Sequence, residues 1–304
     1  MNAKKNLSRF VSVFIAVTVF ASIQLPFVQT ADAAGNKKTV YVVTRTDTTY
    51  KDPWGSSKYS DTYKYNKKGL LKTWKNNDGR TKYKRNKAGL LTALTWYNEK
   101  GKKGSCYKYT VKNGNIAKRR DYEYIKGKKV LTDTTYYTYD AAGRLIIEKI
   151  KSVDGRVCTN TYDSKGYLIK KVINESSGSS SVCTHTITLD KHGNFTKDSM
   201  KTEETDKWGS RVYTDVQKNK YTYNKAGKIT KIVTTFKHDD GSKSKATTKF
   251  TYNKAGKIIK RVYKADEEKS VTVYKYKKIK VSKKYRKLIS AEQKEIVPVT
   301  EQNL

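Results

Sequence analysis

The chain has 304 residues, with 65 Lys and Arg against 28 Asp and Glu, which gives a formal net charge of +37. Hydrophobic residues make up 36% of it, and Tyr is unusually frequent at 24 residues. This composition disfavours a thick aliphatic core, a multi-span membrane protein and a collagen-like fibre. The Tyr, Val and Ile content also argues against a disordered chain.

The N-terminus has the pattern of a secretory signal peptide. Lys4, Lys5 and Arg9 precede an apolar run over residues 10–23, which is too short to span a bilayer comfortably. The small residues of Ala31-Asp32-Ala33 then form a cleavage site, so we expect residues 1–33 to be removed on export. The mature chain would keep a net charge of +35. No second long apolar stretch follows, so we expect no membrane span in it.

Three cysteines follow the signal peptide: Cys106, Cys158 and Cys183. An odd number excludes a fully paired disulfide scaffold. Each cysteine lies an even number of residues before the next Gly, as the tyrosines of the neighbouring turn motif do. All three are therefore predicted to lie on the tyrosine face of their strands. In a simple meander Cys158 and Cys183 would lie two strands apart, about 9–10 Å, which is beyond disulfide reach. We therefore expect no native disulfide.

A short sequence motif recurs along the chain. It consists of two aromatic residues at alternate positions, Asn or Asp, two further residues, Gly, and an aliphatic residue two places after the Gly. Its clearest copies span residues 63–71, 137–145, 221–229 and 250–258. Alternating aromatics share one face of a strand, and Asn or Asp followed by Gly makes a tight turn. Asp-Gly pairs such as Asp78-Gly79 mark further hairpins between the copies. The pattern predicts an all-β fold, a long antiparallel meander of some sixteen to twenty strands.

One copy, Tyr137-Thr138-Tyr139-Asp140-Ala141-Ala142-Gly143-Arg144-Leu145, resembles the YD repeat of the Rhs family. The resemblance covers roughly residues 60–280, with Asn for Asp and Lys for Arg in the other copies. It implies a β-sheet spiral that encloses a toxin or mediates surface contacts. With few repeats and no separate effector domain, we expect a twisted, curled sheet or a short β-spiral.

Catalytic and metal-binding patterns are scarce. The sequence contains no phosphate-binding loop, no Gly-x-Ser-x-Gly motif and no usual spacing of zinc ligands. We therefore predict no enzyme, no catalytic residue, no metal site and no cofactor. Cys183 and His185 with Cys158 form a conceivable metal cluster, but their spacing matches no usual zinc pattern. Strand residues that face the same way explain them more simply.

Basic residues are the main functional clue, and they are densest near the C-terminus. The proposed contacts for an anionic polymer are Lys277, Lys278, Lys280, Lys283, Lys284, Arg286 and Lys287. Outside the cell such a surface meets anionic wall polymers or acidic glycans, whereas a nucleic-acid ligand is disfavoured by the signal peptide. The alternative interpretation of the charge is solubility and protection of strand edges. Trp54 and Trp208, in two Asp-x-Trp-Gly-Ser turns, are glycan-contact candidates, although a turn Trp more often packs over a sheet edge.

These observations predict four segments: a signal peptide (1–33), an N-terminal strand and turn (34–59), YD-like hairpins (60–280), and a basic C-terminal segment and tail (281–304). We expect residues 288–304 to be mobile. The function predicted is a secreted, envelope-associated, non-catalytic interaction or adhesion module. The alternative is an Rhs-type toxin-associated or effector protein. The sequence leaves the oligomeric state open.

Overall fold

The structure is a computed structural model and describes residues 37–298 of the chain. This part forms strands and a short C-terminal helical segment. The strands are β1 (Lys38–Asp52), β2 (Gly55–Tyr65), β3 (Leu71–Asn76), β4 (Gly79–Arg85), β5 (Leu91–Asn98), β6 (Lys103–Lys112), β7 (Asn115–Ile125), β8 (Lys128–Tyr139), β9 (Leu145–Ser152), β10 (Val157–Tyr162), β11 (Leu168–Asn174), β12 (Ser180–Leu189), β13 (Phe195–Asp206), β14 (Gly209–Tyr223), β15 (Ile229–Lys237), β16 (Lys243–Tyr252), β17 (Ile258–Ala265) and β18 (Glu268–Val281). They are followed by the 3-10 helix η2 (Lys283–Tyr285) and the α-helix α2 (Arg286–Ile296).

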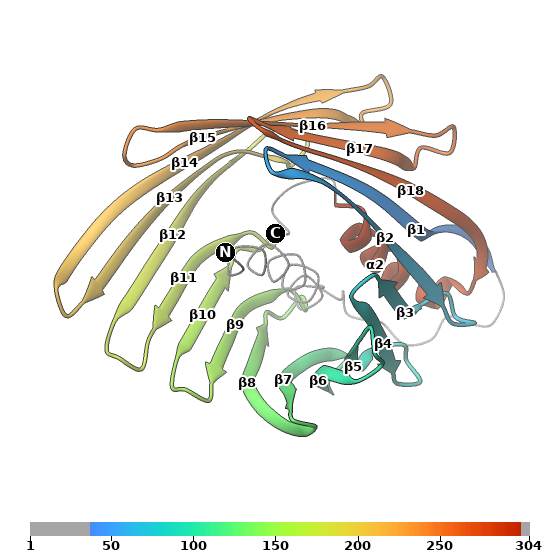
Figure 1. Cartoon of the computed structure of the whole chain (residues 1–304), viewed down its shortest axis with the longest axis horizontal. Helices are drawn as coiled ribbons and strands as arrows, with labels where there is room; N and C mark the ends of the chain where they lie inside the picture. Colours follow the sequence, from blue (N-terminus) through green and yellow to red (C-terminus); the bar gives the residue numbers. More distant parts are fainter. Residues whose placement is uncertain (1–36, 299–304) are drawn as a thin grey trace.

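The strands form one closed antiparallel ring, shown in Figure 1. Each strand pairs with its neighbours in sequence, which confirms the all-β antiparallel meander and the expected number of strands. The ring closes because β1 pairs with β18 from Lys38↔Val281 to Lys51↔Lys269. The predicted curled sheet or spiral is therefore wrong: this is an 18-stranded barrel. Closure removes the two exposed edges that an open meander would leave unpaired.

The repeated turn forms as its residues predict. In the first copy the Gly69 amide donates to the Asn66 carbonyl at 2.9 Å, and the Asn66 side chain accepts from the amides of Lys68 and Leu70. Gly69 has a φ of +78°, and a Cβ there would lie 2.6 Å from Val281 Cγ1. Glycine is thus required at this turn both for its backbone angle and for space.

The tyrosines of the repeat form hydrogen bonds between neighbouring strands. The Tyr252 hydroxyl donates to the Ile229 carbonyl at 2.5 Å, and the Tyr276 hydroxyl donates to the Ile258 carbonyl at 2.6 Å. Tyr139 donates in the same way to the Ile116 carbonyl at 2.9 Å. Each acceptor is the aliphatic residue two places after a turn glycine. The repeat therefore supplies both ends of a hydrogen bond between successive units.

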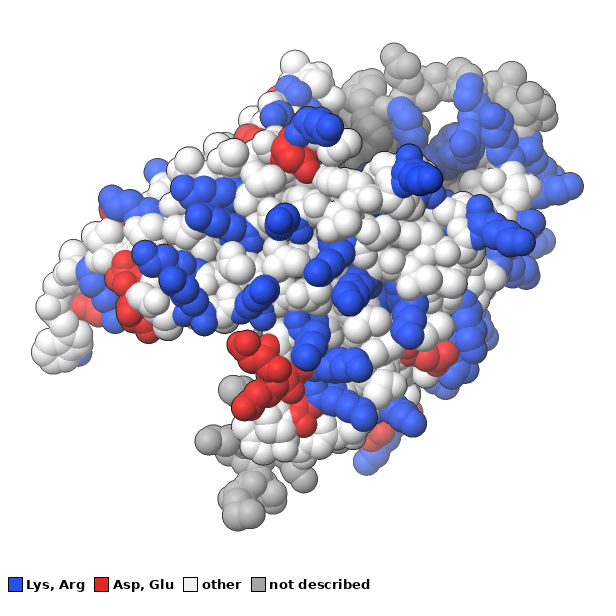
Figure 2. Space-filling model, turned by 90° about the horizontal axis from the view of Figure 1, so that it is seen from above, with Lys and Arg blue, Asp and Glu red and all other residues white. Residues whose placement is uncertain are grey.

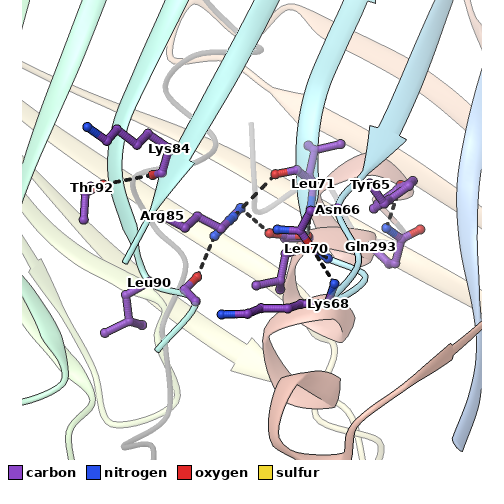
Figure 3. A network of polar contacts seen from close by, with 12 residues as sticks. Tyr65, Asn66, Lys68, Leu70, Leu71, Lys84, Arg85, Leu90, Thr92 and Gln293 are labelled. Atoms are coloured by element: carbon purple, nitrogen blue, oxygen red, sulfur yellow. Dashed lines mark hydrogen bonds and ion pairs between the residues drawn. The ribbon is translucent and has the colours of Figure 1, made fainter. Parts of the chain in front are cut away.

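Helix α2 contacts β1 and β2 where these two strands no longer pair with each other. β2 pairs with β1 only from Gly55 to Thr62, so the last residues of β2 have no β1 partner. Gln293 of α2 bridges this gap: its Oε1 accepts from the Val43 amide at 2.7 Å, and its Nε2 donates to the Tyr65 hydroxyl at 3.0 Å. Figure 3 shows this helix against the turns that end β2 and β4.

A second set of contacts fixes α2 to β3 and β4. Glu292, which is 2% exposed, accepts the Leu71 amide at 2.9 Å and pairs with Arg85. Arg85 also donates to the Gly89 carbonyl at 3.0 Å. Burial raises the pKa of Glu292, and the Arg85 guanidinium opposes that rise. The sequence predicts a mobile tail from residue 288, and this is wrong for the nine residues that α2 orders.

The contacts of α2 identify the inner face of the ring. α2 lies inside the ring in Figure 1, and it packs on the side of the sheet that carries Tyr65, Tyr83 and Leu71. The repeat's aromatic and aliphatic positions therefore point into the lumen. The alternate positions, which include Arg80, Lys82 and Lys84 on β4, are exposed and point outward.

Two apolar clusters cover parts of this inner face. One contains Leu288 and Ile289 of α2 and extends across β3–β9, and the other joins β15–β18. Neighbouring residues Val42 and Val43 of β1 are both fully buried, one in each cluster. The end of the β1–β18 ribbon therefore lies between the two clusters.

Candidate lumenal site

The inner wall divides into a covered part and an open part. On β3–β9 the inward positions are mostly buried, with Leu71, Leu94 and Thr135 at 5% exposure or less. Strands β10, β11 and β12 contain no buried residue at all. On β12 the inward residues are half-buried, while the outward residues Thr184 and Thr186 are exposed. The lumen is therefore open to solvent beside β10–β12.

An ion pair at the rim of β13 and β14 shows the same openness. Arg211 and Glu204 are paired across these strands, with 2.7 Å between Arg211 Nε and Glu204 Oε2. Both share the inward face with buried Thr202, yet the Arg211 side chain is 75% exposed. The rim of the wall at β13 and β14 is therefore open to solvent.

A row of polar side chains crosses the open wall. Cys183 on β12 pairs with Lys171 on β11, and Lys171 pairs with Asn160 on β10. Asn160 Nδ2 donates to Glu148 Oε2 at 2.9 Å, and the Tyr162 hydroxyl donates to the same oxygen at 3.2 Å. Burial raises the pKa of Tyr162, and the Glu148 carboxylate raises it further. The row presents amine, amide, phenol and thiol groups to the lumen.

Cys183, His185 and Asp198 form the most organised group on this wall. His185 Nδ1 lies 2.9 Å from Asp198 Oδ2, and His185 Nε2 lies 3.5 Å from Cys183 Sγ. The His185 and Asp198 side chains are 13% and 17% exposed. The sequence identified Cys183 and His185 but missed Asp198, because its position opposite them depends on the register between β12 and β13.

The three cysteines differ in their surroundings. Cys106 is buried on the outward face of β6, whereas the sequence predicts it on the tyrosine face. This prediction is wrong because Asn113 and Gly114 alone connect β6 to β7, which is a shorter connection than residues 66–70 of the repeat's turn. Cys158 Sγ lies 3.7 Å from Asn160 Oδ1, and burial raises the pKa of this thiol. All three sulfurs are free.

The predicted basic cluster is divided between several surfaces. Lys278 and Lys280 lie on one face of β18 and Lys277 on the other. Lys283 and Lys284 belong to η2, and Arg286 and Lys287 begin α2. The predicted polymer-binding residues are thus arranged around the end of the ribbon and helix, and their role stays a prediction.

Trp54 and Trp208 occupy matching hairpin turns. In each turn the Trp backbone amide donates a hydrogen bond to an Asp side chain. The distance is 2.9 Å from Trp54 N to Asp52 Oδ1 and 2.7 Å from Trp208 N to Asp206 Oδ1. The two Trp side chains are 89% and 84% exposed, so neither packs over a sheet edge as the simpler interpretation expects. Glycan contact by these residues stays a prediction.

Within residues 37–298, no group of three or more His, Cys, Asp or Glu side chains is arranged to hold a metal ion. No helix in this part is both long and apolar enough to span a membrane. The signal peptide predicted over residues 1–33 lies outside the described residues.

No family model and no curated protein matches the chain. Among solved structures, a porin-like protein from Bacteroides vulgatus ATCC 8482 is similar to 78% of this chain and 99% of its own, with 10% identity and a TM-score of 0.39. A porin-like protein from Bacteroides uniformis ATCC 8492 is similar to 77% of this chain and 98% of its own, with 10% identity and a TM-score of 0.27. At these values the likenesses carry no conclusion about function.

The closed barrel contradicts the interpretation of the chain as a YD-repeat protein. The chain closes into a barrel, with β1 paired to β18, instead of winding into a spiral. Both predicted functions, the YD-like adhesion module and the Rhs-type effector, are therefore wrong. The Tyr-x-Tyr and Gly motif is instead the hairpin unit of a closed barrel.

Proposed function

We propose that this chain is an exported, water-soluble β-barrel that binds an amphipathic ligand in the part of its lumen walled by β10–β14. The observation that carries this proposal is the open inner face of β10–β12, where no residue is buried. The inward side chains there are mixed: Ile173, Ile187 and Met200 lie among Lys171 and His185. A concave wall with apolar area and a few polar groups is the usual form of a ligand site.

The outward face argues for water rather than lipid around the barrel. Lys82, Lys149, Lys201 and Lys275 are exposed on this face near the middle of β4, β9, β13 and β18. A Lys at the bilayer midplane costs about 2–4 kcal/mol on the outside of a membrane barrel. Membrane barrels carry an apolar outer band and a polar lumen, whereas here the apolar positions point inward. A membrane channel would need the opposite arrangement.

A dye-binding experiment tests the lumen. The probe is 8-anilinonaphthalene-1-sulfonate, an anionic aromatic molecule that fluoresces on apolar surfaces. We expect saturable binding that is weakened by Ile187→Asp, which places a charge on the inner face. The matched control is Thr188→Asp, one residue along β12 on the outer face, and we expect it to leave binding unchanged. Equal effects of the two changes would overturn a lumenal site.

A vesicle experiment tests the position of the barrel. Without detergent the purified protein should stay in solution and should leave dye-loaded neutral vesicles intact. Stable insertion with dye release would contradict the water-soluble barrel and favour a channel.

The outward charge supports a second proposal, that the barrel is retained at the cell envelope by anionic wall polymer or acidic glycan. Lys and Arg side chains are spread over the face seen in Figure 2, and Asp and Glu gather in fewer places. Such contacts are screened by salt, because the Debye length falls to about 3 Å at 1 M. We expect release from whole cells at about 0.5–1 M salt. Retention at high salt, or free protein at low salt, would contradict it.

A further inference from the structure

We propose that Cys183 is a nucleophilic thiol that accepts an acyl group from an ester entering the lumen, with His185 as its base and Asp198 as the positioning residue for the histidine. This goes beyond ligand binding, and it requires only that small molecules reach β12. The juxtaposition that carries it is a thiol, an imidazole and a carboxylate in line on the open inner wall.

The carboxylate defines which nitrogen of His185 is the base. Asp198 Oδ2 lies 2.9 Å from Nδ1, so the imidazole donates its Nδ1 proton to the carboxylate. Nε2 then carries a lone pair, and it is the nitrogen that faces Cys183 Sγ at 3.5 Å. A thiol within reach of a base that is held by a third group is the arrangement required for nucleophilic activation.

The strand geometry explains why the three groups meet. Cys183 and His185 are two residues apart on β12, so both point to the inner face. Asp198 on β13 pairs with Ile187, and it therefore lies diagonally across from His185 on the same face. Directly opposite Cys183 on the neighbouring strand, Lys171 places a basic residue on the same wall.

Three other residues within the described range, 37–298, have similar side chains, but the surroundings of each lack one element of this group. Cys158 faces an amide oxygen rather than a base, and Cys106 is buried on the outer face with Thr95. His238 pairs with Asp215 at 3.2 Å, and its side chain is 46% exposed in a turn. These sites therefore serve as internal controls.

The proposed reaction is an acyl transfer. The Cys183 proton passes to His185 Nε2 while Sγ forms a bond to the ester carbonyl carbon. The ester C–O bond then breaks, and the proton on His185 passes to the departing oxygen. The products are a thioester on Cys183 and one alcohol, with no oxidant or further reactant needed.

The test uses the purified protein and p-nitrophenyl acetate, with peptide mass spectrometry to locate the acetyl group. We expect about one nitrophenol per chain to be released rapidly, and Cys183 to be acetylated at least about tenfold faster than Cys158. Cys106 should stay unmodified, since its modification would report unfolding. Equal rates at Cys183 and Cys158 in folded protein would overturn the proposal.

Variants separate a chemical role from a structural one. His185→Ala should remove the rate advantage of Cys183, and added imidazole should restore part of it, which a purely structural loss would not allow. Asp198→Asn should lower the rate, and Asp198→Glu should keep more of it. His238→Ala is the matched control and should change nothing. An unchanged rate in His185→Ala would overturn the assignment, whereas the dye experiment above would be unaffected.

Discussion

Strands β3–β9 and strands β10–β12 share the same turn motif, yet only the first group buries its inner face. The Asn66 and Asp163 turns, which precede β3 and β11, close with the same hydrogen bonds. The difference is the second layer: α2 and the end of the β1–β18 ribbon pack near β3 and β4, and their apolar cluster continues across the strands to β9. No equivalent element among residues 37–298 covers β10–β12. The turn motif therefore forms the hairpins of the barrel wall, and packing by α2 buries the inner face of part of that wall.

The largest expected effect comes from removing the charge that anchors α2. Glu292→Ala should lower the free energy of unfolding by about 3–5 kcal/mol, because it leaves Arg85 buried without its carboxylate and the Leu71 amide without an acceptor. Urea unfolding followed by circular dichroism measures this. Glu267→Ala, in the exposed turn before β18, is the control and should change stability by less than about 0.5 kcal/mol. Similar losses in both variants would show that α2 is not the covering layer.

Paired truncations of aliphatic residues compare the two regions directly. Leu71→Ala, at a fully buried position facing α2, should cost about 2–5 kcal/mol. Ile173→Ala on β11 removes a half-buried side chain and should cost clearly less, about 1 kcal/mol. Thermal or urea unfolding of both variants provides the comparison. An equal cost would mean that the lumen beside β11 is packed.

Stability should also depend on pH through the end of α2. Burial raises the pKa of Glu295 to about 7, and nearby Lys294 only partly opposes this. The ordinary pKa of Glu is 4.5, so folding favours the protonated form, and this contribution is complete below about pH 4.5 and is lost as the pH rises through 7. Unfolding at pH 5 and pH 8 should differ more in the native chain than in Glu295→Gln. A difference that is the same in both would exclude Glu295 as its source.

The smallest effect is expected from a single tyrosine hydroxyl. Tyr252→Phe removes the hydrogen bond to the Ile229 carbonyl and should cost about 0.5–1.5 kcal/mol. Tyr136→Phe changes an outward ring that is 40% exposed and should be nearly neutral. If both variants unfold alike, the tyrosine tether between units contributes nothing measurable.

The sequence predicted local structure well, because each part of the repeat acts within its own hairpin. Strand positions, Asn-x-x-Gly turns and the inward tyrosines all follow from spacing of a few residues. Closure of the barrel does not follow from such local spacing, because the pairing of Lys38 with Val281 joins residues at opposite ends of the strand array. Helix α2 was missed because Glu292 and Gln293, which are typical of a solvated tail, here satisfy backbone groups and an arginine.

The lumenal group was predicted only in part for a similar reason. Cys183 and His185 are two residues apart, so their common face is readable from the strand pattern. Asp198 joins them only through the register of β12 with β13, and the openness of the wall depends on which strands share the apolar cluster of α2. Both are properties of the assembled ring rather than of any one repeat.

The closure of the ring is the central claim, and a cross-link between β1 and β18 tests it most directly. Thr48 and Thr272 are paired across these strands, with 2.9 Å between their hydroxyl oxygens. In a chain whose three native cysteines are replaced by Ser, Thr48→Cys with Thr272→Cys should form an intramolecular disulfide, seen by mass spectrometry after digestion without reductant. Thr48→Cys with Thr138→Cys, which lies on the outer face of β8, should not. Efficient cross-linking of the first pair alone is the predicted result, and its absence in folded monomer would contradict the closed barrel.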